Sequence, residues 1–274
     1  MANAEAEALI VHDVSVTFGK MVALQSVSLS AAVGEVVGVI GPNGAGKTTL
    51  FNAISGFVPL RAGRIVLGGR EKRRVRPHQL SKLGVGRTLQ GVGLWPGLTV
   101  LENVMAGAQV SARAGLVSAL LGGLRSSRDE NALASQAMAT LEELQVAELA
   151  DRLPPTLPYA TQKRVALART LVSSPSLLLL DEPASGLSDT ELASLAALLQ
   201  RLKERMAIVL VEHHMDLVMS VCDRVVVLDV GSVIATGTPE DVKGDPAVTD
   251  AYLGQAVDRD SAGSSPAKAT DVDR

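Results

Sequence analysis

A glycine-rich run at residues 41–49 has the residue types and the spacing to hold phosphate groups. Its sequence, Gly-Pro-Asn-Gly-Ala-Gly-Lys-Thr-Thr, fits the pattern G-x-x-x-x-G-K-[ST]. Glycines let successive backbone N–H groups converge on one phosphate, and the N-terminus of a following helix adds a positive dipole. Lys47 can then reach the β- and γ-phosphates, and the Thr48 hydroxyl can hold Mg²⁺. The sequence therefore predicts a nucleoside triphosphate site formed by Gly41, Asn43, Gly44, Ala45, Gly46, Lys47, Thr48 and Thr49.

Two adjacent carboxylates end the apolar run Leu177–Leu180 and supply a second set of reactive groups. Asp181, at the expected end of a strand, can bind Mg²⁺ or one of its waters beside Thr48. Glu182 can polarise an attacking water molecule as a general base. The alternative is a strand that merely ends in solvated acids, and a phosphate loop in the same chain disfavours it. Lys47 and Glu182 are therefore candidate catalytic residues.

Strand-like and helix-like segments alternate around these motifs. The apolar stretch Glu35–Ile40 precedes the loop and the helix start Thr48–Ile54 follows it, which is the order that such a loop requires. Between about 100 and 150 the pattern becomes helical, with Leu141, Leu144 and Leu149 on one face. The alternation predicts an α/β fold, in which a parallel sheet carries helices on its faces and a helical block is inserted in the middle. Further strands are expected at Leu9–Phe18, Gly63–Gly69, Ser176–Leu180, Ala207–Val211 and Arg224–Leu228, and further helices at Leu101–Val110, Leu116–Leu121, Asp129–Leu149 and Thr190–Met206.

Composition narrows the class of protein. The chain has 274 residues and a formal net charge of −3, which argues against a general nucleic-acid binder. Cys222 is the only cysteine, so no intrachain disulfide can form, and this suits the cytosol. No apolar run reaches the roughly 18 residues of a membrane-spanning helix. Residues 1–8 are expected to be a loose leader, 255–274 a disordered tail, and the basic run Arg70–Arg76 a solvated loop rather than a lipid or nucleic-acid contact.

Taken together, these motifs resemble the ATP-binding subunit of ABC-type transporters, over residues 9–254. The resemblance implies a P-loop NTPase core built on a parallel sheet, with an antiparallel β subdomain and an inserted helical subdomain at about 91–170. It also implies hydrolysis of ATP, with Mg²⁺ as cofactor. Members of this family work as pairs, in which two ATPase subunits enclose two nucleotides.

The same resemblance assigns roles to four further positions. Gln90 matches the glutamine that contacts Mg²⁺ and senses the membrane partner. His213 matches a histidine that contacts the γ-phosphate, and Ser185–Ser188 matches the segment called the D-loop. Phe18 lies where an aromatic ring stacks on adenine, for which any π face suffices. A core position remains the alternative for Phe18, and an ordinary satisfied polar residue remains the alternative for His213.

Within the family, the chain is most similar to the larger ATPase of branched-chain amino-acid importers, which are related to urea and amide importers. The stretches 84–90, 98–104 and 245–254 carry this likeness. It implies a second ABC ATPase subunit and integral-membrane permease subunits as partners, with an extracytoplasmic solute-binding protein acting indirectly and no nucleic acid. It also implies a cytoplasmic location, peripheral on the inner face of the cell membrane. Trp95 lies near the expected permease groove, and a contact with the helical block is equally compatible with the sequence.

One motif departs from the family pattern. The usual signature Leu-Ser-Gly-Gly-Gln is replaced by Leu-Pro-Tyr-Ala-Thr at residues 157–161, so Pro158, Tyr159 and Ala160 would face the phosphates of the partner's nucleotide. Pro158 lacks both the serine hydroxyl and an N–H group, although proline suits the start of a helix. Ala160 is tolerable if its φ is negative. The sequence therefore predicts an asymmetric pair of ATPases, with a competent site of its own and a weaker contribution to its partner's site.

Three other functions stay open at this point. An exporter or lipopolysaccharide-transport ATPase would have a similar chain. A non-transport ATPase of translation or DNA repair usually carries two such domains, a long coiled coil or zinc-binding cysteines, and this chain has none of these. A regulatory subunit that hardly hydrolyses ATP is favoured by the altered signature and disfavoured by Glu182 and His213.

Overall fold

The computed structural model of the chain describes residues 7–72, 75–88, 91–109 and 124–252. Four expectations lie wholly or partly outside the described residues: residues 1–6 of the loose leader, the magnesium contact of Gln90, the helix at Leu116–Leu121 and the tail at 255–274. Within the described ranges, no helix combines the length and the apolar character needed to cross a bilayer.

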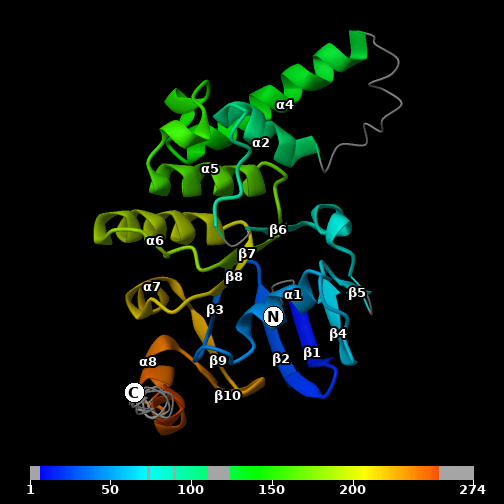
Figure 1. The fold of residues 1–274 in the computed structure, drawn as a ribbon, viewed down its shortest axis with the longest axis vertical. Coiled ribbons are helices and arrows are strands. Elements are labelled where there is room, and N and C mark those ends of the chain that lie inside the picture. Colours follow the sequence, from blue (N-terminus) through cyan, green and yellow to red (C-terminus); the bar gives the residue numbers. More distant parts are fainter. Residues whose placement is uncertain (1–6, 73–74, 89–90, 110–123, 253–274) are drawn as a thin grey trace, which may run out of the picture.

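A six-stranded sheet forms the centre of the molecule (Figure 1). Its strand order is β10-β9-β3-β8-β7-β6, and all neighbours are parallel except β10, which pairs antiparallel with β9. The α/β fold expected from the sequence is confirmed. The strands are β3 (Val36–Ile40), β6 (Val85–Arg87), β7 (Leu177–Asp181), β8 (Ala207–Val211), β9 (Arg224–Asp229) and β10 (Ser232–Gly237).

The central strands are apolar, apart from Asp181 at the end of β7, because both faces of the sheet are covered. On β7, Leu178 and Leu180 point into a core shared with helices, while Leu177 and Leu179 point into a core shared with a second sheet. Strands β3, β8 and β9 divide their side chains between the two cores in the same alternating way. This burial on both faces fixes the positions of the strand ends.

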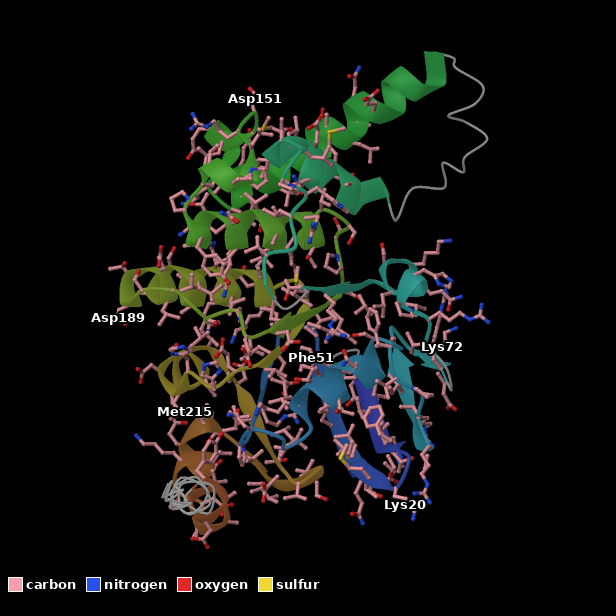
Figure 2. The ribbon with its side chains drawn as sticks, in the orientation of Figure 1. Lys20, Phe51, Lys72, Asp151, Asp189 and Met215 are labelled. Carbon is pink, nitrogen blue, oxygen red and sulfur yellow. The ribbon has the colours of Figure 1, made fainter. Side chains whose placement is uncertain are left out.

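The second sheet is antiparallel and has the order β2-β1-β4-β5. Helix α1 packs between the two sheets, and its Phe51 is fully buried there (Figure 2). Lys20 and Lys72 extend outward from the far end and the outer edge of this sheet (Figure 2). The elements are β1 (Glu7–Phe18), β2 (Met21–Ala32), β4 (Ala62–Leu67), β5 (Arg70–Lys72) and α1 (Lys47–Ile54).

Helices α2, α4 and α5 form a separate block, drawn in green in Figure 1. Together with α6 and α7, the block supplies the core on the other face of the central sheet. The helices are α2 (Val100–Gln109), α4 (Leu124–Glu143), α5 (Tyr159–Leu171), α6 (Asp189–Lys203), α7 (Met215–Val221) and α8 (Pro239–Lys243), and a further helical run begins at residue 246. Short 3₁₀ turns lie at Pro77–Gln79, Ser81–Leu83, Ala147–Leu149 and Pro154–Thr156.

Three expectations about elements were wrong. Glu7 and Ala8 belong to strand β1 rather than to a loose leader, because Ala8 is buried in the core. The basic run does not start as a loop: the turn Gly68–Gly69 sends the chain back as β5, which pairs with β4. The helix expected to reach Leu149 ends at Glu143, because the next residue but one, Gln145, adopts a left-handed φ of 58°.

Candidate functional site

The ends of neighbouring strands bring the predicted reactive groups to one edge of the central sheet. Strand β3 lies beside β8, and β8 lies beside β7. Because these strands are parallel, their carboxyl ends share one edge, which is where open α/β sheets bind ligands. The phosphate loop follows β3, Asp181 ends β7, and His213 lies two residues beyond β8.

The loop at residues 41–46 has a backbone that two of its glycines make possible. Gly41 has a φ of 147°, and a Cβ there would lie 2.0 Å from the carbonyl oxygen of Leu228. Gly46 has a φ of 104° and caps helix α1, and a Cβ there would lie 2.8 Å from the Ala23 carbonyl oxygen. Any other residue at either position would clash with neighbouring backbone. The sequence pattern is therefore a physical requirement of this loop.

Lys47 lies in the first turn of α1 and reaches back over the loop. Its Nζ donates to the carbonyl oxygens of Gly41 at 2.6 Å and Pro42 at 2.9 Å. Burial lowers the pKa of the Lys47 ammonium group, and the negative charge of Glu182 opposes that lowering. The loop lysine and the candidate base are therefore within electrostatic reach of each other. The neighbouring Thr48 is exposed.

Asp181 is almost fully buried and forms an ion pair that the sequence did not predict. Its Oδ2 lies 3.5 Å from a guanidinium nitrogen of Arg87, which is the last residue of the adjacent strand β6. The same nitrogen of Arg87 donates to Asn52 Oδ1 at 3.0 Å. Burial raises the pKa of the Asp181 carboxyl, and the Arg87 charge counteracts the rise. Arg87 thus ties the end of β7 to helix α1.

Glu182 and His213 approach each other from adjacent strands. His213 Nδ1 lies 4.0 Å from Glu182 Oε1, and both side chains are partly exposed. Glu182 has a φ of 48°, in the left-handed region, which costs about 1 kcal/mol or more for a residue with a side chain. Such strain concentrates at functional sites. The neighbouring His214 is instead the N-cap residue of helix α7, and the centre of its ring lies 4.9 Å from that of His213.

The remaining predicted ligands lie on two further elements, the end of strand β1 and the start of helix α5. Phe18 is half-exposed at the end of β1, in the hairpin whose second strand, β2, borders the phosphate loop at Ala23. Pro158 caps helix α5, whose first turn contains Tyr159 and Ala160. Ala160 is helical, so its φ is negative, as the sequence argument required. The adenine and phosphate roles of these residues stay predictions.

Ser188, which stands where the family often has aspartate, caps helix α6. Its Oγ lies 2.7 Å from Glu191 Oε2, and its N–H donates to the same oxygen at 2.7 Å. Both contacts tie Ser188 to the third residue of α6, so serine preserves the start of that helix. Trp95, left open between two roles, is half-exposed with its ring 5.1 Å from the guanidinium carbon of Arg169 on α5.

Sequence reasoning missed three charged residues near the site: Arg87, Lys163 and Glu212. Each lies beside a recognised motif, but each acts on groups that are distant in sequence. Their sequence signal was a charged residue next to an apolar strand or helix. Such a charge indicates a partner, since unpaired charges are rarely buried. Their partners could not be read from that signal.

The donor atoms at the edge suit a hard cation. Among the described residues, no group of three or more His, Cys, Asp or Glu side chains is arranged to hold a metal by itself. Magnesium commonly uses one or two protein oxygens together with substrate phosphates. The Thr48 hydroxyl and the Asp181 carboxylate offer oxygen ligands of that kind.

Comparison with known proteins agrees with this architecture. Residues 24–185 match the ABC transporter family, and residues 232–258 match the family described as branched-chain amino acid ATP-binding cassette transporter. The chain is 38% identical over 250 residues to the high-affinity branched-chain amino acid transport ATP-binding protein LivG of Salmonella typhimurium, covering 90% of this chain and 98% of LivG. It is 31% identical to the lipopolysaccharide export system ATP-binding protein LptB of Haemophilus influenzae, covering 85% and 91%.

The fold has a solved counterpart. A nucleotide-free ATP-binding cassette from an ABC transporter superposes with a TM-score of 0.78 at 29% identity, covering 90% of this chain and 98% of the other. Both comparisons span nearly the whole length of the relatives. The chain therefore belongs to the ABC transporter family, as one of its ATP-binding subunits.

Proposed function

We propose that this chain is the ATP-hydrolysing subunit of an importer for branched-chain amino acids or a related amide. The observation that carries the proposal is the match over almost the full length of LivG, together with the branched-chain amino acid family match at residues 232–258. An ABC ATPase acts through membrane permease subunits. We place the chain on the cytoplasmic face of the membrane, with a solute-binding protein acting on the other side.

The chemistry is transfer of the γ-phosphoryl group of ATP to water. The loop amides and Lys47 bind the β- and γ-phosphates and stabilise the charge that develops there. Glu182 orients the attacking water and accepts its proton, and His213 contacts the γ-phosphate from the adjacent strand. The 4.0 Å approach of His213 Nδ1 to Glu182 Oε1 supports a shared task for these two side chains.

Magnesium would be held by the Thr48 hydroxyl and by Asp181, directly or through water, with Gln90 as a further contact. When bound, the cation would supply positive charge beside the β- and γ-phosphates. Arg87 holds the Asp181 side chain in place through an ion pair in which both side chains are nearly buried.

The test of the importer proposal is uptake in a strain that lacks this chain. Uptake of radiolabelled leucine, isoleucine and valine should fall at least tenfold, and the wild-type chain should restore it. Glutamate uptake serves as the control and should not change. Unchanged uptake together with altered lipopolysaccharide at the cell surface would instead support the export function of the LptB relative.

We also infer that the chain works in an asymmetric pair of ATPases. The chain has the full set of residues expected for its own site, namely the phosphate loop, Asp181 and Glu182. Pro158, in contrast, offers neither a hydroxyl nor an N–H group to a partner's nucleotide. The purified chain alone should hydrolyse ATP at least tenfold more slowly than the chain mixed with its partner ATPase. Equal rates per site in the two preparations would mean that the altered signature functions normally, and the asymmetry would be rejected.

A further inference from the structure

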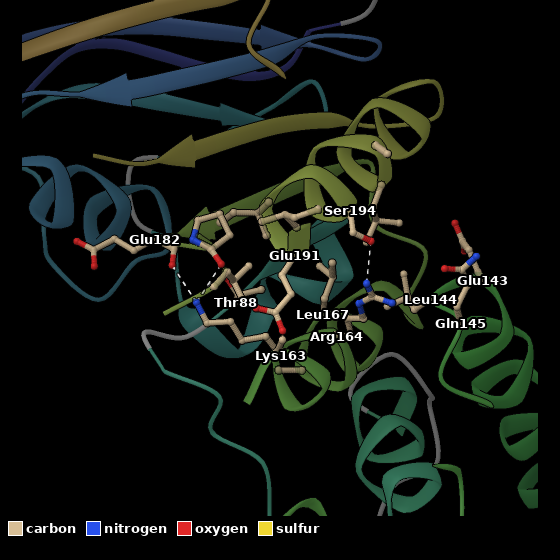
Figure 3. Close-up of a pocket in the computed structure, with 18 of the residues that line it drawn as sticks. Thr88, Glu143, Leu144, Gln145, Lys163, Arg164, Leu167, Glu182, Glu191 and Ser194 are labelled. Carbon is tan, nitrogen blue, oxygen red and sulfur yellow. Dashed lines mark hydrogen bonds between the residues drawn. The ribbon is translucent and has the colours of Figure 1, made fainter. Parts of the chain in front are cut away.

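The turn that follows β7 is hydrogen-bonded to a lysine from helix α5. Lys163, on helix α5, donates through Nζ to three carbonyl oxygens of this turn: Glu182 at 3.4 Å, Pro183 at 2.9 Å and Ser185 at 2.5 Å. Figure 3 shows Lys163 reaching the backbone of the turn, while the Glu182 carboxylate points to the opposite side. Lys163 therefore binds the backbone that presents the Glu182 side chain, and not that side chain itself.

The buried carboxylate of Glu212 binds the same turn by accepting a hydrogen bond from one of the turn's backbone N–H groups. The Glu212 side chain has no exposed surface. Its Oε1 accepts a hydrogen bond from the Ala184 N–H at 2.6 Å, and its Oε2 accepts from the N–H groups of His213 at 2.9 Å and His214 at 3.1 Å. All three partners donate, which an ionised carboxylate satisfies with both oxygens. Glu212 thus joins the catalytic turn to the segment that carries His213.

Lys163 and Glu212 are oppositely charged and bind opposite kinds of backbone group in one short turn. Lys163 donates to its carbonyl oxygens, and Glu212 accepts from an N–H group. Burial lowers the pKa of the Lys163 ammonium group, while the negative charges of Glu212 and Glu182 oppose the lowering. Glu182 itself needs such support, because its φ of 48° is unfavourable for a residue with a side chain. A further hydrogen bond, from the Glu182 N–H to the Val211 carbonyl oxygen at 3.0 Å, completes its orientation.

We propose that Lys163 and Glu212 are positioning residues that lock the Glu182 turn between the signature helix α5 and the His213 segment. This inference rests on the proposed role of Glu182 as the base. Lys163 lies one helical turn after Tyr159, and its Nζ is 5.3 Å from the centre of the Tyr159 ring. A movement of the signature helix is therefore transmitted to the chain's own catalytic carboxylate through Lys163, which links the two nucleotide sites of the pair.

The test compares Lys163→Met and Glu212→Gln in the assembly that hydrolyses ATP. Methionine keeps the length of Lys163 but removes its donors, and glutamine turns one acceptor of Glu212 into a donor that faces backbone N–H groups. We expect kcat to fall at least tenfold in both variants, with nucleotide affinity and KM within twofold of wild type. We also expect faster amide hydrogen exchange at residues 184–186. Lys163→Arg, which keeps several donors, should restore at least a third of the wild-type kcat.

Two matched controls separate this effect from simple loss of an ion pair. Lys203→Met removes the contact of Lys203 Nζ with Asp223 Oδ1 at 2.7 Å, and Glu143→Gln alters a pair with Arg205 at 2.7 Å. Both controls should keep the wild-type kcat. If Glu212→Gln fails to fold, Lys163→Met decides the question, because Lys163 is only partly buried.

Three outcomes would overturn the proposal: a kcat of Lys163→Met within twofold of wild type, an equal loss of affinity and turnover, or unchanged amide exchange in the turn. The Glu182→Gln variant distinguishes this failure from failure of the proposed function. If Glu182→Gln is inactive while Lys163→Met is normal, only the positioning role is rejected. If Glu182→Gln keeps normal turnover, the base assignment itself is wrong.

Discussion

Replacing Glu182 with glutamine is expected to slow ATP hydrolysis by about a hundredfold to a thousandfold while leaving ATP bound. The amide cannot accept a proton from the attacking water, and general base catalysis contributes about 10²–10⁴ in rate. The loop amides and Lys47 are untouched, so binding should persist. The change is also conservative for the backbone, because glutamine has the same size at the strained φ of 48°. Steady-state hydrolysis and binding of a fluorescent ATP analogue measure the two quantities separately.

A second readout is the assembly state. If hydrolysis normally separates the paired ATPases, the Glu182→Gln variant should accumulate as a closed dimer in the presence of ATP and Mg²⁺, seen by size-exclusion chromatography. Glu204→Gln is the matched control, because Glu204 is exposed at the end of α6. Normal turnover in the Glu182 variant would remove the base assignment, and His213 would become the group to test next.

The central sheet could be predicted because its strands are buried on both faces. Runs such as Leu177–Leu180 need no partner information to be recognised as strands, and parallel strands with motifs at their carboxyl ends bring those motifs together. The place of Asp181 and Glu182 beside the phosphate loop could be expected from the motifs themselves, whereas the role of His213 rested on the family resemblance. The glycine pattern also encodes a backbone that only glycine tolerates at Gly41 and Gly46.

Elements whose existence depends on a partner strand were missed. The charged strand β5 forms because the turn at Gly68–Gly69 returns the chain along β4, whatever its side chains. β10 is paired by β9 in a similar way, and its side chains are only partly buried. The end of the helix expected at Asp129–Leu149 was wrong for a different reason. Leu141 and Leu144 are both buried as expected, but the left-handed Gln145 ends the helix before Leu149.

The missed site residues share a physical cause. Lys163 and Glu212 bind backbone groups of the turn that follows β7, and backbone atoms carry no sequence signal. Arg87 pairs with Asp181, 94 positions later by their residue numbers, across the β6–β7 contact. Motifs mark the residues expected to touch the substrate, whereas Arg87, Lys163 and Glu212 contact those residues or their backbone.

Replacing Lys47 with alanine is expected to weaken ATP binding by about a hundredfold and to abolish measurable turnover. Charge-assisted hydrogen bonds contribute about 1.5–3 kcal/mol each, and the lysine ammonium can make such bonds to the β- and γ-phosphates. The loss should exceed that of any other single loop side chain, because the remaining contacts are mostly backbone N–H groups. Titration with a fluorescent ATP analogue and steady-state hydrolysis give the two values.

The structure also predicts what this substitution will leave intact. Lys47 Nζ bonds the carbonyl oxygens of Gly41 and Pro42, but the shape of the loop is set by Gly41, by Gly46 and by the buried face of α1. The thermal midpoint without nucleotide should therefore change by only a few degrees, while the stabilisation that ATP normally adds should disappear. Lys82→Ala, at an exposed position, should bind ATP normally. Wild-type affinity in the Lys47 variant would contradict the assignment of residues 41–49 as the phosphate loop.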